Sequence, residues 1–77
     1  MTAVDEELDA RGLLCPLPVL KAAKRLRGLD PGSVLRMLAD DPAAVIDVPH
    51  FCKEQGYKLL SAHAAEGHQI YVIQKPL

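Results

Sequence analysis

A cysteine followed by two prolines is the segment of this sequence best suited to chemistry. Residues 12–18 read GLLCPLP, and Pro16 follows Cys15 directly. Proline is preferred at the first position of a helix, so we predict that Cys15 caps a helix beginning near Pro16. Unpaired amides at a helix start favour an anion and lower the pKa of a thiol there, and Arg11 and Lys21 would add to this effect. Cys15 is thus the candidate nucleophile.

The two prolines also restrict which amides can reach the sulfur. Pro16 and Pro18 carry no amide hydrogen, so Leu17 is the only donor among the first three helical residues. We therefore predict a hydrogen bond from the Leu17 amide to the sulfur of Cys15. A stiff helix start would hold the sulfur outward, which suits the transfer of a second sulfur atom. The alternative is that Cys15 is a small apolar side chain buried in a leucine-rich turn.

The second cysteine, Cys52, is predicted to have a structural role. Cys-Pro-Leu-Pro lacks the second thiol of a Cys-x-x-Cys redox motif. Cys52 falls about ten residues into the second predicted helix, up to roughly 15 Å from the end that carries Cys15. A disulfide between the two is therefore not expected. Packing beside Phe51 in the core is the favoured interpretation of Cys52, and a catalytic role is the alternative.

Length and composition restrict the class of protein. The chain has 77 residues, 49% apolar and 25% charged, with a formal net charge of −1, as expected for a single globular domain over 1–77. This charge disfavours direct binding to nucleic acid. The segment Met1–Glu7 lacks the pattern of a secretion signal, and the apolar stretch Leu13–Leu20 is too short to span a membrane. We therefore expect a cytoplasmic protein with reduced thiols and no membrane association.

Periodicity predicts four strands and two helices. The predicted elements are a strand around Leu8 and Ala10, a helix from Pro16 to Gly28, a strand over Val34–Ala39, a helix from Asp41-Pro42 to Gly56 with a kink or break at Pro49, and a hairpin of Tyr57–Ala65 and His68–Lys75 that turns at Glu66-Gly67.

Two right-handed crossovers in the same direction place both helices on one face of the sheet. The predicted fold class is α+β, a two-layer α/β sandwich with the order βαβαββ and a four-stranded mixed sheet. The uninterrupted apolar run Ile70–Ile73 expects neighbours on both sides, whereas Lys58 and His63 suit an edge strand, so the predicted strand order is 1-2-4-3.

Charged residues are expected near Cys15. Asp40 and Asp41 follow the second strand, and the carboxyl ends of neighbouring parallel strands meet at one edge of a sheet. They would orient a basic side chain of a partner, or Asp41 would only cap a helix while Asp40 stays solvated. The basic residues of the first helix would meet an acidic partner surface or form a solvated face; the candidates are Lys21, Lys24 and Arg25.

Two further features concern binding. The three histidines and Cys52 have no recognisable metal-ligand spacing, so no metal is expected. In the fourth strand, alternation puts Tyr71 and Ile73 on one face and Ile70 and Val72 on the other, so the face of the sheet without helices would stay partly apolar. That face is a candidate docking surface or weak dimer contact, and we expect a monomer or a weak dimer.

Several segments together resemble a known family. Leu8–Pro18, Ala39–Pro42 and Phe51-Cys52 resemble the TusA (SirA-like) sulfur carrier family, whose signature is Cys-Pro-x-Pro (CPxP) after a first strand. The resemblance implies that Cys15 accepts persulfide sulfur from a cysteine desulfurase or related donor and hands it to an acceptor protein. The sulfur would be carried covalently, with no separate cofactor. The residues expected to support Cys15 in the active-site loop are Arg11, Gly12, Pro16, Leu17, Pro18, Asp40 and Asp41.

The resemblance leaves the pathway open. Members that serve 2-thiouridine formation in tRNA often have glutamate where this chain has Leu17. Relatives serve molybdenum-cofactor sulfur delivery, sulfur oxidation or selenium metabolism. Two other classes of function compete with sulfur transfer: a cysteine peroxidase or other redox protein, and a protein-interaction module that does not use the thiol. An RNA-binding role would require a broad basic surface, which the charge balance disfavours.

Overall fold

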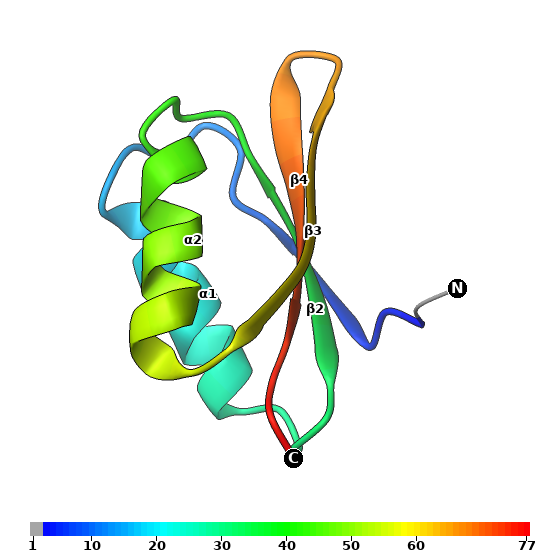
Figure 1. The fold of residues 1–77 in the computed structure, drawn as a ribbon. Helices are drawn as coiled ribbons and strands as arrows, with labels where there is room; N and C mark the ends of the chain where they lie inside the picture. Colours follow the sequence, from blue (N-terminus) through cyan, green and yellow to red (C-terminus); the bar gives the residue numbers. More distant parts are fainter. Residues whose placement is uncertain (1–2) are drawn as a thin grey trace.

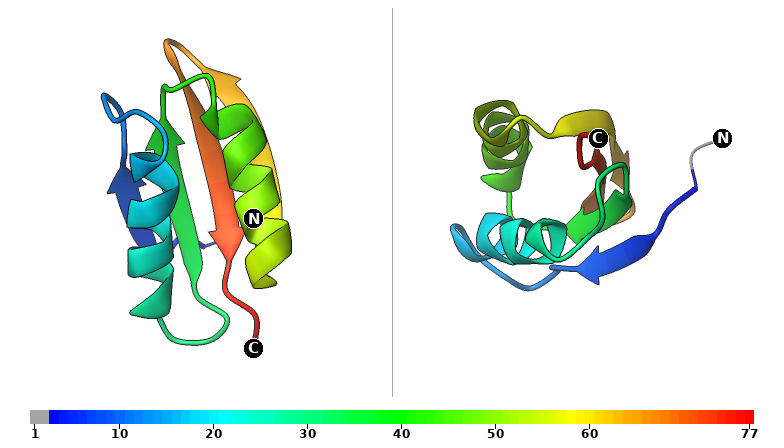
Figure 2. Two further views of the ribbon diagram at one scale, coloured as in Figure 1. Left: turned by 90° about the vertical axis from the view of Figure 1, so that its left-hand side faces the viewer. Right: turned by 90° about the horizontal axis from the view of Figure 1, so that it is seen from below.

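The computed structural model describes residues 3–77 as one sheet with two helices. The elements are β1 (Glu6–Asp9), α1 (Leu17–Arg27), β2 (Val34–Ala39), α2 (Ala44–Gln55), β3 (Lys58–Ala65) and β4 (His68–Gln74). The strand order is β1-β2-β4-β3, with β1 parallel to β2 and the other pairs antiparallel. Both helices cover the same face of the sheet (Figures 1 and 2). The predicted fold class and strand order are confirmed; of the predicted domain, Met1 and Thr2 lie outside the described residues.

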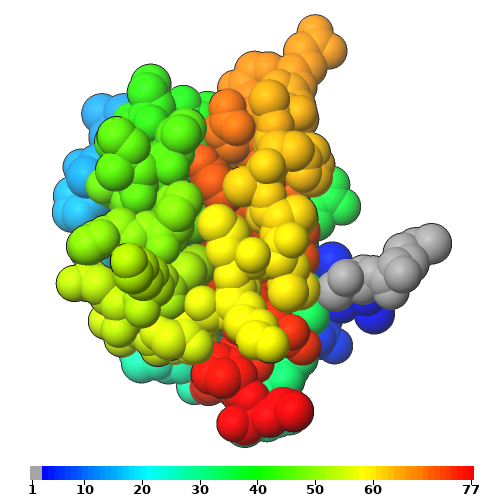
Figure 3. Space-filling view, viewed as in Figure 1, coloured from blue at the N-terminus to red at the C-terminus, as the bar shows by residue number. Residues whose placement is uncertain are grey.

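The core lies between the helices and the two central strands. Leu35 pairs with Ile73 and Met37 with Tyr71 across β2 and β4, and all four side chains are buried. Because side chains alternate along a strand, this register turns one apolar row from each central strand toward the helices. In the space-filling view, side chains close the gap that the ribbons leave between α2 and the sheet (Figure 3).

Helix α1 packs through a narrow apolar stripe. Ala22 and Leu26 are fully buried at helical spacing, and the helix ends at Gly28 as predicted. Its start differs from the prediction. The helix begins at Leu17 with Pro16 at the capping position, so Cys15 precedes the helix rather than capping it.

Helix α2 runs through Pro49 without dividing into two helices. It also begins at Ala44, after a turn, and not at Pro42. The amide missing at Pro49 would have paired with the carbonyl of Val45, whose side chain is half exposed, so water can satisfy that carbonyl. The helix ends at Gly56, whose φ of 76° is the left-handed conformation that glycine adopts without strain.

The opposite face of the sheet carries apolar side chains beside a charged residue, Arg36. Leu38 pairs with Ile70 and Arg36 with Val72, and these side chains point away from the helices. The predicted division of β4 into two faces is thus confirmed, as is the edge position of β3. No helix within residues 3–77 is long and apolar enough to cross a membrane.

Candidate functional site

Cys15 lies in the loop between β1 and α1, and its side chain is exposed. Since β1 and β2 are parallel, the loop that follows β2 ends at the same edge of the sheet. Figure 2 shows these two loops and the first turns of both helices gathered at that end of the molecule. The buried alternative for Cys15 is therefore wrong.

Two carboxylates from the β2–α2 loop hold the backbone of the cysteine loop. The amide of Gly12 donates to Asp40, with N–O distances of 2.9 Å to Oδ1 and 3.1 Å to Oδ2. The amide of Cys15 donates to Oδ2 of Asp41 at 2.5 Å, while Oδ1 of Asp41 accepts the amide of Ala43 at 3.1 Å. Asp40 thus accepts a hydrogen bond from the cysteine loop and is not merely solvated. Asp41 caps the turn before α2 and also fixes Cys15.

A third carboxylate contacts the sulfur itself. Sγ of Cys15 donates to Oδ2 of Asp47 at 3.1 Å. Asp47 lies in the first turn of α2 and is half-buried. Sequence reasoning missed this residue. The available signal was an acidic residue in the second turn of a helix whose predicted start, Asp41-Pro42, was already placed near Cys15.

This contact reverses the predicted electrostatics of the thiol. The hydrogen bond to Asp47 raises the pKa of Cys15, and desolvation and the negative charges of Asp47 and Asp41 act in the same direction. The predicted lowering is therefore wrong, as is the predicted hydrogen bond from Leu17. The amide of Leu17 donates to the carbonyl of Leu14 at 2.9 Å. Because α1 begins two residues after Cys15, the sulfur lies outside the ring of free helical amides.

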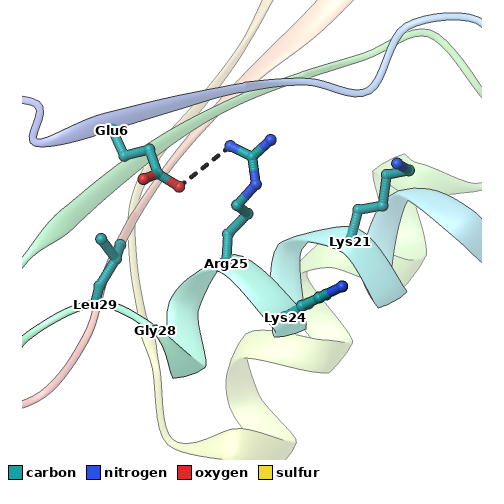
Figure 4. A pocket seen from close by; sticks show the side chains of 6 residues that line it. All are labelled: Glu6, Lys21, Lys24, Arg25, Gly28 and Leu29. Atoms are coloured by element: carbon teal, nitrogen blue, oxygen red, sulfur yellow. Dashed lines mark hydrogen bonds and ion pairs between the residues drawn. The ribbon is translucent and has the colours of Figure 1, made fainter.

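The basic residues predicted to act near Cys15, on α1 and on the loop before it, have other surroundings. Arg11 forms a two-point ion pair with Asp9, at 2.9 Å from Nε and 3.0 Å from Nη2, which lowers the pKa of Asp9 to about 2 and raises that of Arg11. Lys21, Lys24 and Arg25 border a separate hollow of about 400 Å³ beside β1. There Arg25 points toward Glu6, to which Nη1 donates at 3.2 Å (Figure 4).

A groove between the helices opens directly beside the thiol. Its volume is about 250 Å³, and its lining is formed by Cys15, Pro16 and Val19 from the α1 side and by Asp47, His50, Phe51 and Glu54 from α2. The charged groups of the groove thus all come from α2. Pro18, the second proline of the motif, is buried in α1 and helps to line a smaller hollow between Cys15 and Asp47.

Exposed apolar side chains flank the thiol in the sequence and at the start of α2. We call four of them the apolar rim: Leu14, Leu17, Val45 and Ile46. Leu14 is 70% and Ile46 is 74% exposed, which leaves apolar surface for a protein contact at the end of the molecule that carries Cys15.

Cys52 is a core residue, as predicted. Its side chain is 2% exposed and belongs to the same buried cluster as Phe51. Burial raises the pKa of its thiol to about 11. Both cysteines are free. Within residues 3–77, no group of three or more His, Cys, Asp or Glu side chains is arranged to hold a metal ion.

Comparison with known proteins assigns the family. The model of the family described as sulfurtransferase TusA matches residues 6–75. The chain belongs to the TusA family. It is 43% identical over 72 residues to the sulfur carrier protein TusA of Pseudomonas syringae pv. syringae, covering 94% of this chain and 86% of that protein. It is 41% identical over 75 residues to the TusA protein of Allochromatium vinosum, covering 97% and 99%.

A solved structure agrees with the TusA fold. The crystal structure of a SirA-like protein from Desulfitobacterium hafniense superimposes with a TM-score of 0.81 at 26% identity, covering 94% of this chain and 99% of that one. The resemblance predicted from the CPxP segment is thus confirmed, and the family supports a sulfur carrier role for the chain.

Proposed function

We propose that Cys15 accepts the outer sulfur of a donor protein's persulfide, carries it as its own persulfide and passes it to an acceptor protein. A cysteine desulfurase is the donor class that fits. The supporting observation is an exposed thiol, on a loop held by Asp40 and Asp41, in a chain of the sulfur carrier family. In this proposal the chain works in the cytoplasm with reduced thiols, and the sulfur is bound covalently without a separate cofactor.

The transfer is an exchange of sulfur–sulfur bonds. The thiol of Cys15 loses its proton, and the electron pair of Sγ attacks the outer sulfur of the donor persulfide. The donor's sulfur–sulfur bond breaks, its electron pair stays on the donor's inner sulfur, and that sulfur takes up a proton. Cys15 becomes a persulfide and the donor becomes a thiol, so no external oxidant or reductant is consumed. Transfer to the acceptor repeats the same exchange with Cys15 as the donor.

Two surfaces would receive the partner proteins. The apolar rim flanks Cys15 and would be covered when another protein brings its cysteine to Sγ. The basic residues Lys21, Lys24 and Arg25 line one side of α1 and would speed the approach of an acidic partner surface. Arg25 is already paired with Glu6, so Lys21 and Lys24 are the stronger candidates.

Labelled sulfur tests the proposal directly. The chain is incubated with a bacterial cysteine desulfurase and 35S-cysteine, and label on the protein is measured under non-reducing conditions. We expect label on the native chain and on Cys52→Ser, and none on Cys15→Ser. The label should sit on the tryptic peptide of residues 12–21, which contains Cys15. Equal label on the native chain and on Cys15→Ser would refute the assignment.

The redox alternative is less well supported by the geometry. A peroxidase cysteine needs a ready thiolate, whereas Asp47 raises the pKa of Cys15. Cys52 is buried and cannot act as a resolving thiol without unfolding of the core. Consumption of hydrogen peroxide by the native chain, lost in Cys15→Ser and unaccompanied by sulfur loading, would favour the redox function instead.

A further inference from the structure

The contact between Cys15 and Asp47 leaves the nucleophile in its less reactive form. The thiolate, not the thiol, attacks sulfur, and a carboxylate at 3.1 Å from Sγ stabilises the thiol by accepting its proton in a hydrogen bond. A sulfur carrier must nevertheless react quickly once its partner has docked. The resting geometry therefore needs a change at Asp47 during the encounter.

The surroundings of Asp47 indicate what that change is. Among residues 3–77, no lysine, arginine or histidine nitrogen lies within ion-pair distance of the Asp47 carboxylate. Arg11 pairs with Asp9 and Arg25 with Glu6, so these two arginines are engaged with other carboxylates. Asp47 thus has a hydrogen bond from the thiol but no counter-charge of its own.

The groove has space for a positively charged side chain of another protein, and its own charged groups suit such a side chain. Its charged or titratable lining groups are Asp47, His50 and Glu54, and His50 already contacts Glu54 at 3.4 Å. The α1 side contributes Pro16 and Val19, which bring no charge. The other carboxylate acting on the thiol, Asp41, also carries a negative charge. Within residues 3–77, the two charges that act on the Cys15 thiol are both negative, and a basic side chain would complement the groove.

We propose that the groove receives a lysine or arginine that the sulfur-exchanging partner carries beside its own cysteine, and that this cation takes Asp47 away from the thiol and so activates Cys15. This inference rests on the proposed function for the identity of the partner. Once the cation pairs with Asp47, the thiol proton passes to water and the electron pair of Sγ attacks the partner's outer sulfur. The bond changes are those of the exchange described above.

Activation of Cys15 by the partner's cation would restrict the reaction of the thiol to the correct partner. An isolated chain keeps Cys15 protonated, which slows its reaction with stray disulfides and peroxides. A partner with the cation in place reverses the local charge at the moment when the two sulfurs meet. Binding of the cation in the groove would thereby recognise the partner and activate the Cys15 thiol in one step.

Charged thiol reagents test the groove without any partner protein. The rate of modification of Cys15 is measured with trimethylammonium-ethyl methanethiosulfonate, which is positive, and with sulfonatoethyl methanethiosulfonate, which is negative. The ratio of these two rates is divided by the ratio of the rates at which the same reagents modify 2-mercaptoethanol. This removes the intrinsic difference between the reagents. One unit charge about 8 Å away in water changes the rate of a singly charged reagent by a factor of about 2.4, so two reagents of opposite charge differ about fivefold. We expect the native chain to prefer the positive reagent by about that factor.

Three conservative variants locate the effect. Asp47→Asn should lower the normalised ratio about threefold, and Glu54→Gln should lower it less, because Glu54 lies farther along the groove. Asp30→Asn removes the same charge in the turn between α1 and β2 and should leave the ratio unchanged. A ratio that is equal in Asp47→Asn and Asp30→Asn, or a native preference for the negative reagent, would overturn the proposal. Circular dichroism confirms that each variant is folded.

Small persulfides separate this inference from the proposed function. Cysteamine persulfide carries a cation beside its sulfur, and 3-mercaptopropionate persulfide carries an anion. Faster loading of Cys15 by the cationic donor, lost in Asp47→Asn, supports both proposals. Loading at equal rates by both donors refutes the groove while leaving sulfur transfer intact. If Cys15 prefers the positive thiosulfonate but neither persulfide loads it, the result supports the groove and refutes sulfur transfer.

Discussion

The amide of Gly12 lies 2.9 Å from Oδ1 of Asp40, although the two residues are 28 positions apart in the chain. Gly12 has a φ of 82°, a left-handed conformation that side chains disfavour. The loop that presents Cys15 therefore depends on a glycine at one end and on a carboxylate from a different loop.

Gly12→Ala is expected to disturb the site specifically. An added Cβ has no atom within 4 Å, so the cost is backbone strain of about 1 kcal/mol. Gly67→Ala in the β3–β4 turn, with a φ of 76° and equally free space, is the matched control. Both variants should lose similar stability in urea unfolding, but only Gly12→Ala should slow sulfur loading of Cys15. Equal loading by the two variants would show that the loop conformation is not needed.

Asp47→Asn is expected to make Cys15 easier to deprotonate. Because Asp47 raises the pKa of the thiol, the pH midpoint for alkylation by neutral iodoacetamide should lie above the usual value of a cysteine and fall in the variant. The rate at pH 7.5 should rise several-fold. A midpoint that is unchanged or higher in the variant would contradict the assignment of the hydrogen bond.

The same contact predicts how stability depends on pH. The folded chain holds the Cys15 proton more tightly than the unfolded chain, so the contact stabilises the fold at neutral pH. This contribution is fully present below the pKa of an unfolded cysteine and is lost as the pH rises through the higher folded pKa. Urea unfolding of the native chain and Asp47→Asn at pH 7 and pH 10 should show their difference shrinking in alkali; a difference that grows would count against it.

Cys52 is expected to matter for stability and not for sulfur loading. Cys52→Ser places a hydroxyl in the apolar core beside Phe51 and should lower the free energy of unfolding by about 2 kcal/mol. Cys52→Ala leaves only a small void and should cost about 1 kcal/mol. Both variants should load sulfur at the native rate under conditions where they are folded. Loss of loading in folded Cys52→Ala would give Cys52 a chemical role.

The apolar rim is expected to contribute to partner docking. Leu17→Ser and Ile46→Ser alter exposed side chains, so stability should change by less than about 0.5 kcal/mol. Sulfur transfer from a cysteine desulfurase should slow several-fold, while loading by a small persulfide stays at the native rate. Leu60→Ser, an exposed leucine on the edge strand β3, is the control and should affect neither rate. An equal effect of all three on desulfurase transfer would remove the rim from the interface.

The architecture could be predicted because it follows from patterns that many residues share. The apolar run Ile70–Ile73 required a central strand, and the two crossovers allowed only one arrangement of the helices. The position of Asp40 and Asp41 near Cys15 followed from the parallel pairing of β1 and β2. These inferences tolerate errors of a residue or two in the boundaries.

The prediction of the chemistry at Cys15 was sensitive to an error of one residue in the start of a helix. A helix beginning at Pro16 would have aimed free amides at Cys15, whereas α1 begins at Leu17 and its first amide bonds to Leu14. The thiol then turns toward α2 and meets Asp47, whose contact depends on the orientation of a helix that starts far along the chain. Side-chain direction at a loop is set by tertiary packing, and periodicity carries no information about it.

The groups that act on Cys15 all come from the second half of the chain. Its amide is bound by Asp41 and its thiol by Asp47, while Gly12 is bound by Asp40. A synthetic peptide of residues 8–27 would contain the CPxP motif and the whole sequence of α1, yet none of these three carboxylates. Such a peptide would display the reactivity of an ordinary cysteine, so inhibitors selected against it would not recognise the thiol that the folded chain presents.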